Sequence, residues 1–100
     1  MSENIITIKV STDENHVPTD IIWSAAGGDI KSRQAKAMSL SMWDEKDRTS
    51  MNMDLWTKDM SVDEMKRFIC DSMMTLAKTL ETATSDKGHA EAIRGFTSEL

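Results

Sequence analysis

The chain has 100 residues, and 12 Lys and Arg against 17 Asp and Glu give it a net charge of −5. That length suits one domain with one modest core. Because an acidic surface repels phosphate groups, nucleic acid and anionic lipid are poor partners for it. No apolar run approaches the length of about 18 residues that a membrane-spanning helix needs, so we expect no direct membrane insertion.

The first residues lack the features of a signal peptide. They have neither a basic start nor a long apolar run, and Glu3, Asp13 and Glu14 introduce acidic groups. The single cysteine, Cys70, allows no internal disulfide. We therefore expect residues 1–100 to form a single domain that stays in the cytoplasm.

Four segments have the β-branched composition or the two-residue alternation that is typical of β-strands. In residues 38–43, Met and Leu alternate with Ser and Trp, and residues 50–57 repeat the alternation after a polar loop. The Gly27-Gly28-Asp29 run indicates a turn, because glycine adopts positive φ without steric cost. The predicted strands cover about residues 4–10, 19–25, 35–43 and 50–57.

A helix start follows the last strand. Ser61 and Glu64 have the spacing of a capping box, and Met residues on either side of the cap are placed for a hydrophobic staple. Apolar residues then recur every three or four positions, which predicts an amphipathic helix over about 61–84. The apolar stripe comprises Met65, Phe68, Ile69, Met73, Leu76, Leu80 and Ala83. Residues 86–100 are expected to form a short second helix or a tail.

These elements together predict an α+β fold. A four-stranded antiparallel sheet, made of two hairpins, would pack on the long C-terminal amphipathic helix. The Met/Leu face of the sheet and the apolar stripe of the helix would bury each other.

No catalytic, cofactor-binding or metal-binding residues are predicted. His16 and His89 are the two histidines, and neither has a second ligand at zinc-site spacing. Cys70, Met73 and Met74 could be imagined as soft-metal ligands, but Met at these positions fits a core filler better. We therefore expect a protein that is not an enzyme and has no cofactor.

Two tryptophans fall on the polar face of the predicted hairpin. Pairing Met42 with Met53 places Trp43 and Trp56 four residues apart along the strands, about 13 Å, with Asp54 between them. Either the protein itself covers this face, through its C-terminal segment or a homodimer, or the tryptophans anchor a foreign partner. In the second case Trp43 and Trp56 are the candidate partner-binding residues, and Asp54 is a polar contact.

Two longer runs carry a family resemblance. AKAMSLSMWD at 35–44 and DLWTKDMSVDEMK at 54–66 resemble the gliding-motility GldC family of the Bacteroidetes. The earlier IKVSTDENHVPTDIIWSA is similar to the opening of that family, so the resemblance covers residues 5–84. It implies a small accessory protein of the gliding machinery, which in these bacteria is tied to the type IX secretion system. It implies no catalytic residues.

The resulting expectation is a non-enzymatic accessory protein that supports gliding motility through protein–protein interaction. Its partners would be other gliding or secretion machinery proteins. The alternative is a chaperone-like carrier for a secreted or envelope client, which would add a client strand to an exposed sheet edge. An enzyme or small-molecule binder would require a closed polar pocket with convergent titratable groups.

Overall fold

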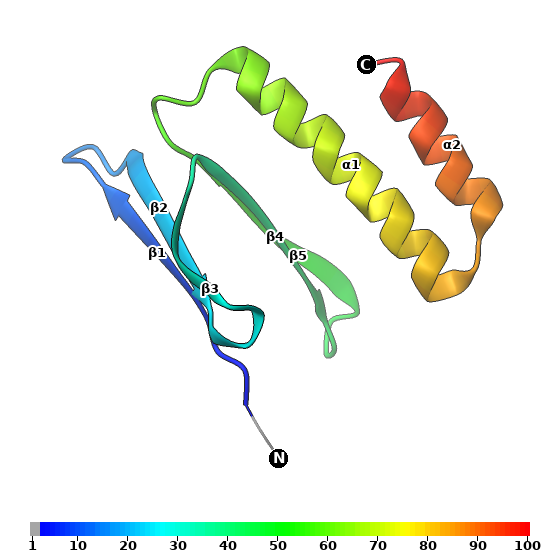
Figure 1. Ribbon diagram of the computed structural model, residues 1–100, viewed down its shortest axis with the longest axis horizontal. Helices are drawn as coiled ribbons and strands as arrows, with labels where there is room; N and C mark the ends of the chain where they lie inside the picture. The colour runs from blue at the N-terminus through cyan, green and yellow to red at the C-terminus, as the bar shows by residue number, and fades with distance from the viewer. Residues whose placement is uncertain (1–2) are drawn as a thin grey trace. The chain divides into compact units, whose positions relative to one another are not determined.

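The structure is a computed structural model that describes residues 3–100 (Figure 1). The chain forms two compact units, which divide between Met60 and Ser61, and each unit is described by itself. The first unit contains β1 (Ile6–Thr12), β2 (Pro18–Ala25), a 3-10 helix (Ala26–Gly28), β3 (Ile30–Ala35), β4 (Ala37–Asp44) and β5 (Thr49–Trp56). The second unit contains α1 (Val62–Thr84) and α2 (Lys87–Ser98). The α+β class and the antiparallel pairing are as predicted.

Strands β1, β2 and β3 form an antiparallel sheet with β2 in the centre. Val10 lies opposite Ile21 and Ile8 lies opposite Trp23, so these four side chains share one face of the sheet. Ile21 is 1% exposed and is the largest fully buried side chain of the described residues. This face therefore holds the core of the first unit.

The prediction of one four-stranded sheet is wrong. The strands divide into this three-stranded sheet and a separate two-stranded hairpin of β4 and β5. Strand β3 was missed because its central residues, Lys31 to Gln34, are all polar and show no apolar alternation. It pairs with β2 through its backbone at the edge of the sheet, where side-chain burial is not required.

The hairpin is attached to the three-stranded sheet at its base. Lys36 separates β3 from β4, and the Thr57 amide donates to the Lys36 carbonyl at 2.8 Å, which extends the hairpin ladder to this residue. The Lys58 amide then donates to the Pro18 carbonyl at the start of β2, at 3.0 Å. The Lys58 ammonium also forms a 3.1 Å ion pair with Asp13 in the β1–β2 turn. One lysine thus joins the end of the hairpin to the first two strands.

The turn after β2 differs from its prediction in detail. Asp29, and not a glycine, adopts the left-handed conformation, with φ of 57°. Gly27 lies close to Asn4 instead, since a Cβ atom there would be 2.6 Å from the side-chain oxygen of Asn4, which would have to move aside.

Helix α1 begins at the predicted cap. The Ser61 hydroxyl accepts from the Glu64 amide, the Glu64 carboxylate accepts from the Ser61 amide, and both distances are 3.0 Å. At its other end, Ser85 adopts a φ of 62° and donates its amide to the Glu81 carbonyl at 2.8 Å. The capping box predicted from the sequence is confirmed.

Helix α2 is longer than the short helix or tail that was expected, with 12 residues. It packs against α1, and the small residues Ala77 and Ala90 are both fully buried. An ion pair of 3.0 Å joins Arg94 on α2 to Glu81 on α1. Within the second unit, the packing partner of α1 is therefore α2. None of the helices in residues 3–100 has the length and hydropathy needed to cross a membrane.

Candidate protein-binding surface on the β4–β5 hairpin

Strands β4 and β5 are paired along their whole length. Met42 lies opposite Met51 and not opposite Met53, so the observed register differs from the predicted one by two residues. Because side chains alternate between the two faces with a period of two, this shift leaves every residue on its predicted face. The faces were predicted correctly, and the cross-strand neighbours were not.

One face of the hairpin carries a tryptophan at each end. Trp43 lies opposite Ser50 near the tip, and Trp56 lies opposite Ala37 at the base. They are therefore about six residues apart along the strands, or roughly 20 Å, and not four as predicted. Trp43 is 67% exposed and Trp56 is 55% exposed. The two rings are separate apolar spots on a polar face.

Asp54 lies between the tryptophans, as predicted, directly opposite Ser39. The Ser39 hydroxyl donates to Asp54 Oδ1 at 2.6 Å. Within residues 3–100, Asp54 Oδ2 has no hydrogen-bond partner. The carboxylate is thus held in place by one oxygen and presents the other for an incoming donor.

The opposite face of the hairpin is apolar. Three cross-strand pairs line it, namely Met38–Leu55, Leu40–Met53 and Met42–Met51. The residues nearest the base are half-buried, whereas Met42, Met51 and Met53 are each more than half exposed. Within the first unit, this face is therefore covered near the base of the hairpin and exposed toward its tip.

Trp23, the third tryptophan of the chain, does not belong to the surface formed by Trp43 and Trp56. It is half-buried beside a cavity of 250 Å³ between the core face of the three-stranded sheet and the start of β4. The cavity is lined by Ile8, Ile21, Trp23, Ala35, Ala37, Met38 and Ser39. Trp23 is therefore a residue of the core.

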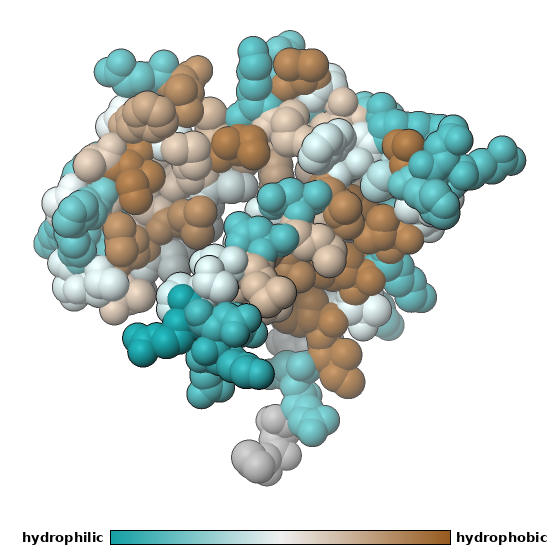
Figure 2. All heavy atoms as spheres, turned by 180° about the vertical axis from the view of Figure 1, so that it is seen from behind, coloured by the Kyte–Doolittle hydropathy of each residue, from teal (hydrophilic) through white to brown (hydrophobic). Residues whose placement is uncertain are grey.

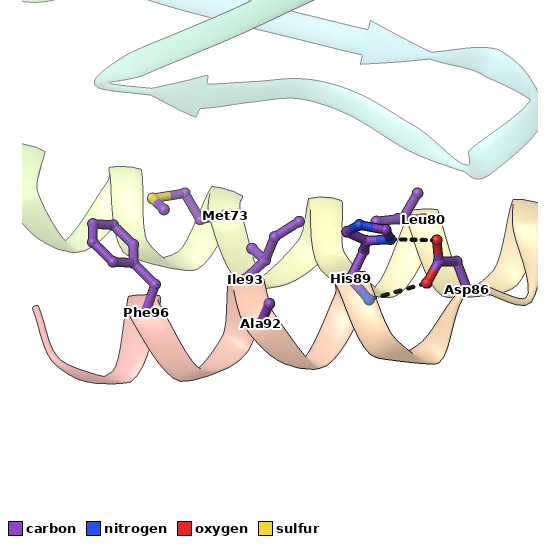
Figure 3. A pocket seen from close by; sticks show the side chains of 7 residues that line it. All are labelled: Met73, Leu80, Asp86, His89, Ala92, Ile93 and Phe96. Carbon is purple, nitrogen blue, oxygen red and sulfur yellow. Dashed lines mark hydrogen bonds and ion pairs between the residues drawn. The ribbon is translucent and has the colours of Figure 1, made fainter.

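The second unit contains a pocket of 480 Å³ between its two helices (Figure 3). Its lining is apolar except at one end, where His89 Nδ1 lies 2.6 Å from Asp86 Oδ2. The Asp86 carboxylate also accepts the His89 amide at 3.0 Å, as the N-cap of α2. Both bonds hold the pKa of Asp86 below its usual range, and the bond from the His89 backbone amide has a larger effect than the bond to the His89 side chain. The closeness of Asp86 and His89 is therefore explained by the N-terminal cap of α2.

In the described part of the chain, no three His, Cys, Asp or Glu side chains gather closely enough to hold a metal ion.

Comparison with known proteins identifies the family. A family model described as gliding motility-associated protein GldC-like matches residues 18–100. The match includes both strands of the hairpin and both helices, so Trp43 and Trp56 lie within it. No curated protein and no solved structure matches the chain. Because the family model covers more than half of the sequence, the chain belongs to the GldC-like family of gliding motility-associated proteins.

Proposed function

We propose that this protein is a non-enzymatic accessory protein of gliding motility, and that it binds another protein of the gliding or secretion machinery through the Trp43/Trp56 face of the β4–β5 hairpin. The family match supports the association with gliding. The observation that supports the binding surface is the exposure of two tryptophans on a two-stranded scaffold. Tryptophan is enriched among the residues that carry binding energy in protein interfaces.

The two rings are large enough to matter energetically. Full burial of a tryptophan removes about 150–250 Å² from water, and because Trp43 is 67% exposed and Trp56 is 55% exposed, the pair could bury about 180–300 Å² on binding. That is roughly a quarter to a third of the 800 Å² or so that each partner contributes to a standard interface. Asp54 adds orientation, because its free oxygen would accept from a donor placed between two apolar pockets of the partner. With a net charge of −5, association with a basic partner would be faster at low salt.

The test compares two double variants of the same hairpin. Trp43→Ala/Trp56→Ala removes the anchors, and Met42→Ala/Met51→Ala removes two side chains of similar exposure from the opposite face. Tagged proteins are recovered from cross-linked cells, and the captured protein is then purified and titrated against each variant. We expect the Trp variant to lose binding and the Met variant to retain it.

Two outcomes would contradict the proposal. If the folded Trp variant binds the partner as tightly as the wild type, the tryptophans are not anchors. If the Trp variant loses several kcal/mol of stability instead, the rings are part of a packed core. The proposal also places the protein in the cytoplasm, and fractionation of the same cells tests whether it is recovered there.

A second candidate is a carrier for a secreted or envelope client, and the exposed Met42, Met51 and Met53 favour it. Methionine side chains are flexible and polarizable, and they are over-used on surfaces that bind many partners. A carrier would bind unfolded segments of several clients with little dependence on salt. The Met variant would then lose binding while the Trp variant retained it, which reverses the result expected above.

A further inference from the structure

Among residues 3–100, strand β1 pairs with a neighbour on one side only. In the three-stranded sheet it pairs with β2, and its other edge is open. The Ala26 amide donates to the Ile5 carbonyl at 3.4 Å, in line with the β1–β2 register. Because bonded and non-bonded pairs alternate in an antiparallel ladder, the backbone N–H and C=O groups of Ile6, Ile8 and Val10 point away from β2.

This edge lacks most of the devices that protect sheet edges. Such edges are usually blunted by proline, by bulges or by charged side chains. The irregularity in β1 lies at Ser11 and Thr12, so residues 6–10 are regular. They contain no proline, and Lys9 is their one charged residue. The other edge strand, β3, is interrupted, since Ser32 has a φ of 46°.

The edge is also apolar. Ile6 is 68% exposed, and Ile8 and Val10 are each more than one-third exposed. Figure 2 shows a band of apolar atoms that rises from the N-terminal end of the chain, where β1 begins. An open row of backbone donors and acceptors beside apolar side chains favours pairing with another strand.

We propose that the edge of β1 pairs with β1 of a second copy of the chain, antiparallel and with two-fold symmetry about Ile8. Ile8 then lies opposite the partner's Ile8, and Ile6 lies opposite the partner's Val10. All three outward-facing residues form backbone bonds. The two three-stranded sheets become one six-stranded sheet, and their apolar faces become continuous.

The sequence of β1 selects this register. Apolar and polar residues are arranged symmetrically about Ile8, with Thr7 and Lys9 on either side. A dyad at Lys9 would place two ammonium groups directly opposite each other, which is destabilising. A dyad at Thr7 would place Val10 opposite Asn4, which lies outside the strand. With the dyad at Ile8, each Lys9 faces the partner's Thr7 and meets no like charge.

Because β1 can pair with another β1 without placing like charges opposite each other, we propose a second copy of the chain as its binding partner. Pairing of two short strands buries less than the 800 Å² or so per partner of a standard interface, so we expect a weak dimer that depends on protein concentration. The pairing uses no residue of the β4–β5 hairpin. It therefore goes beyond the proposed function and stands or falls separately from it.

Two opposite charges at one position give a sharp test. Thr7 is exposed, and each dimer contains two contacts between Thr7 and the partner's Lys9. Thr7→Glu should tighten the dimer and Thr7→Lys should weaken it, each by about twofold to thirtyfold, as measured by sedimentation equilibrium. Overall repulsion between two chains of net charge −5 would have the opposite effect, because an added Glu increases that repulsion and an added Lys decreases it. Thr79→Glu and Thr79→Lys, on the exposed side of α1, serve as matched controls.

The proposal is overturned if the wild type and Thr7→Glu both sediment as monomers at the highest soluble concentration. It is also overturned if both Thr7 variants shift the dissociation constant in the same direction.

Cross-linking checks the register in a Cys70→Ser background. Positions 7 and 9 of opposite chains would be a non-bonded pair with Cα atoms about 4.5 Å apart, within disulfide reach. A mixture of Thr7→Cys and Lys9→Cys chains should form linked dimers. Efficient linkage of Lys9→Cys to itself would place the dyad at Lys9 and refute the register.

Discussion

Ser39 and Asp54 lie directly opposite each other in the β4–β5 hairpin and are joined by a 2.6 Å hydrogen bond from the serine hydroxyl to the carboxylate. The bond lies between the two exposed tryptophans, so it fixes where the carboxylate sits on the proposed binding surface. An exposed bond of this kind contributes little to folding, because water competes for both groups. Its value is positional.

Ser39→Ala should therefore separate binding from stability. We expect the free energy of unfolding to fall by no more than about 1 kcal/mol, while binding of the partner weakens several-fold because the carboxylate is no longer oriented. Denaturant unfolding and titration of the partner measure the two effects. Ser41→Ala on the same face, opposite Asn52, is the control. Equal effects of the two substitutions on binding would show that the position of Asp54 is unimportant.

Ile21→Ala should destabilise the first unit more than any other single truncation in the three-stranded sheet. Ile21 is on the central strand, is almost fully buried and lines the cavity beside β4. Truncation enlarges that cavity, and such changes cost about 2–5 kcal/mol. Ile22→Ala, from the opposite and half-buried face, should cost clearly less. Urea unfolding of both variants compares them, and a larger loss for Ile22→Ala would contradict the assignment of the core face.

Acid should weaken the start of α2. Both bonds to His89 lower the pKa of Asp86 in the folded protein below its ordinary value of 3.8. A lowered folded-state pKa gives stabilisation that is fully present above pH 3.8 and is lost as the pH falls through the lower value.

The comparison is between the wild type and Asp86→Asn, which keeps a good N-cap but does not titrate. We expect the difference in helix content between them, followed by circular dichroism from about pH 5 to about pH 2, to change within this acid window. Parallel curves for the two proteins would show that Asp86 does not control the start of the helix.

The cap of α1 can be removed and then replaced. Ser61→Ala deletes the hydroxyl that accepts from the Glu64 amide, and loss of an N-cap costs about 0.5–2 kcal/mol. Ser61→Asp restores an acceptor and should recover most of the loss. Thermal unfolding followed by far-ultraviolet circular dichroism, which reports helix content, measures both variants. If Ser61→Ala leaves the midpoint of thermal unfolding unchanged, the Ser61 cap does not stabilise the protein.

The elements best predicted from the sequence were those with local signals. The Ser61–Glu64 capping box depends on groups three residues apart, so its hydrogen bonds form wherever the chain enters a helix. The faces of the hairpin follow from strict alternation, and both tryptophans are exposed on the face where the pattern placed them.

What the sequence could not supply was long-range pairing. Alternation repeats every two residues, so registers that differ by two fit the pattern equally well, and the pairing of Met42 was wrong by that amount. Strand β3 has polar central residues and exists through its backbone bonds to β2. The separation of β4 from the first sheet depends on a bend at a single residue, Lys36, and no composition signal marks it.

The attachment of the hairpin through Lys58 has a consequence for motion. Two attachments hold the base of the hairpin: the chain itself at Lys36, and Lys58, which bonds Pro18 through its amide and Asp13 through its ammonium group. The Lys58 amide proton can exchange with deuterium only when its hydrogen bond to the Pro18 carbonyl breaks. Amides in the middle of the hairpin exchange only when the hydrogen bonds between β4 and β5 break. Comparing these two rates distinguishes a hairpin that swings as a rigid body from one that unzips.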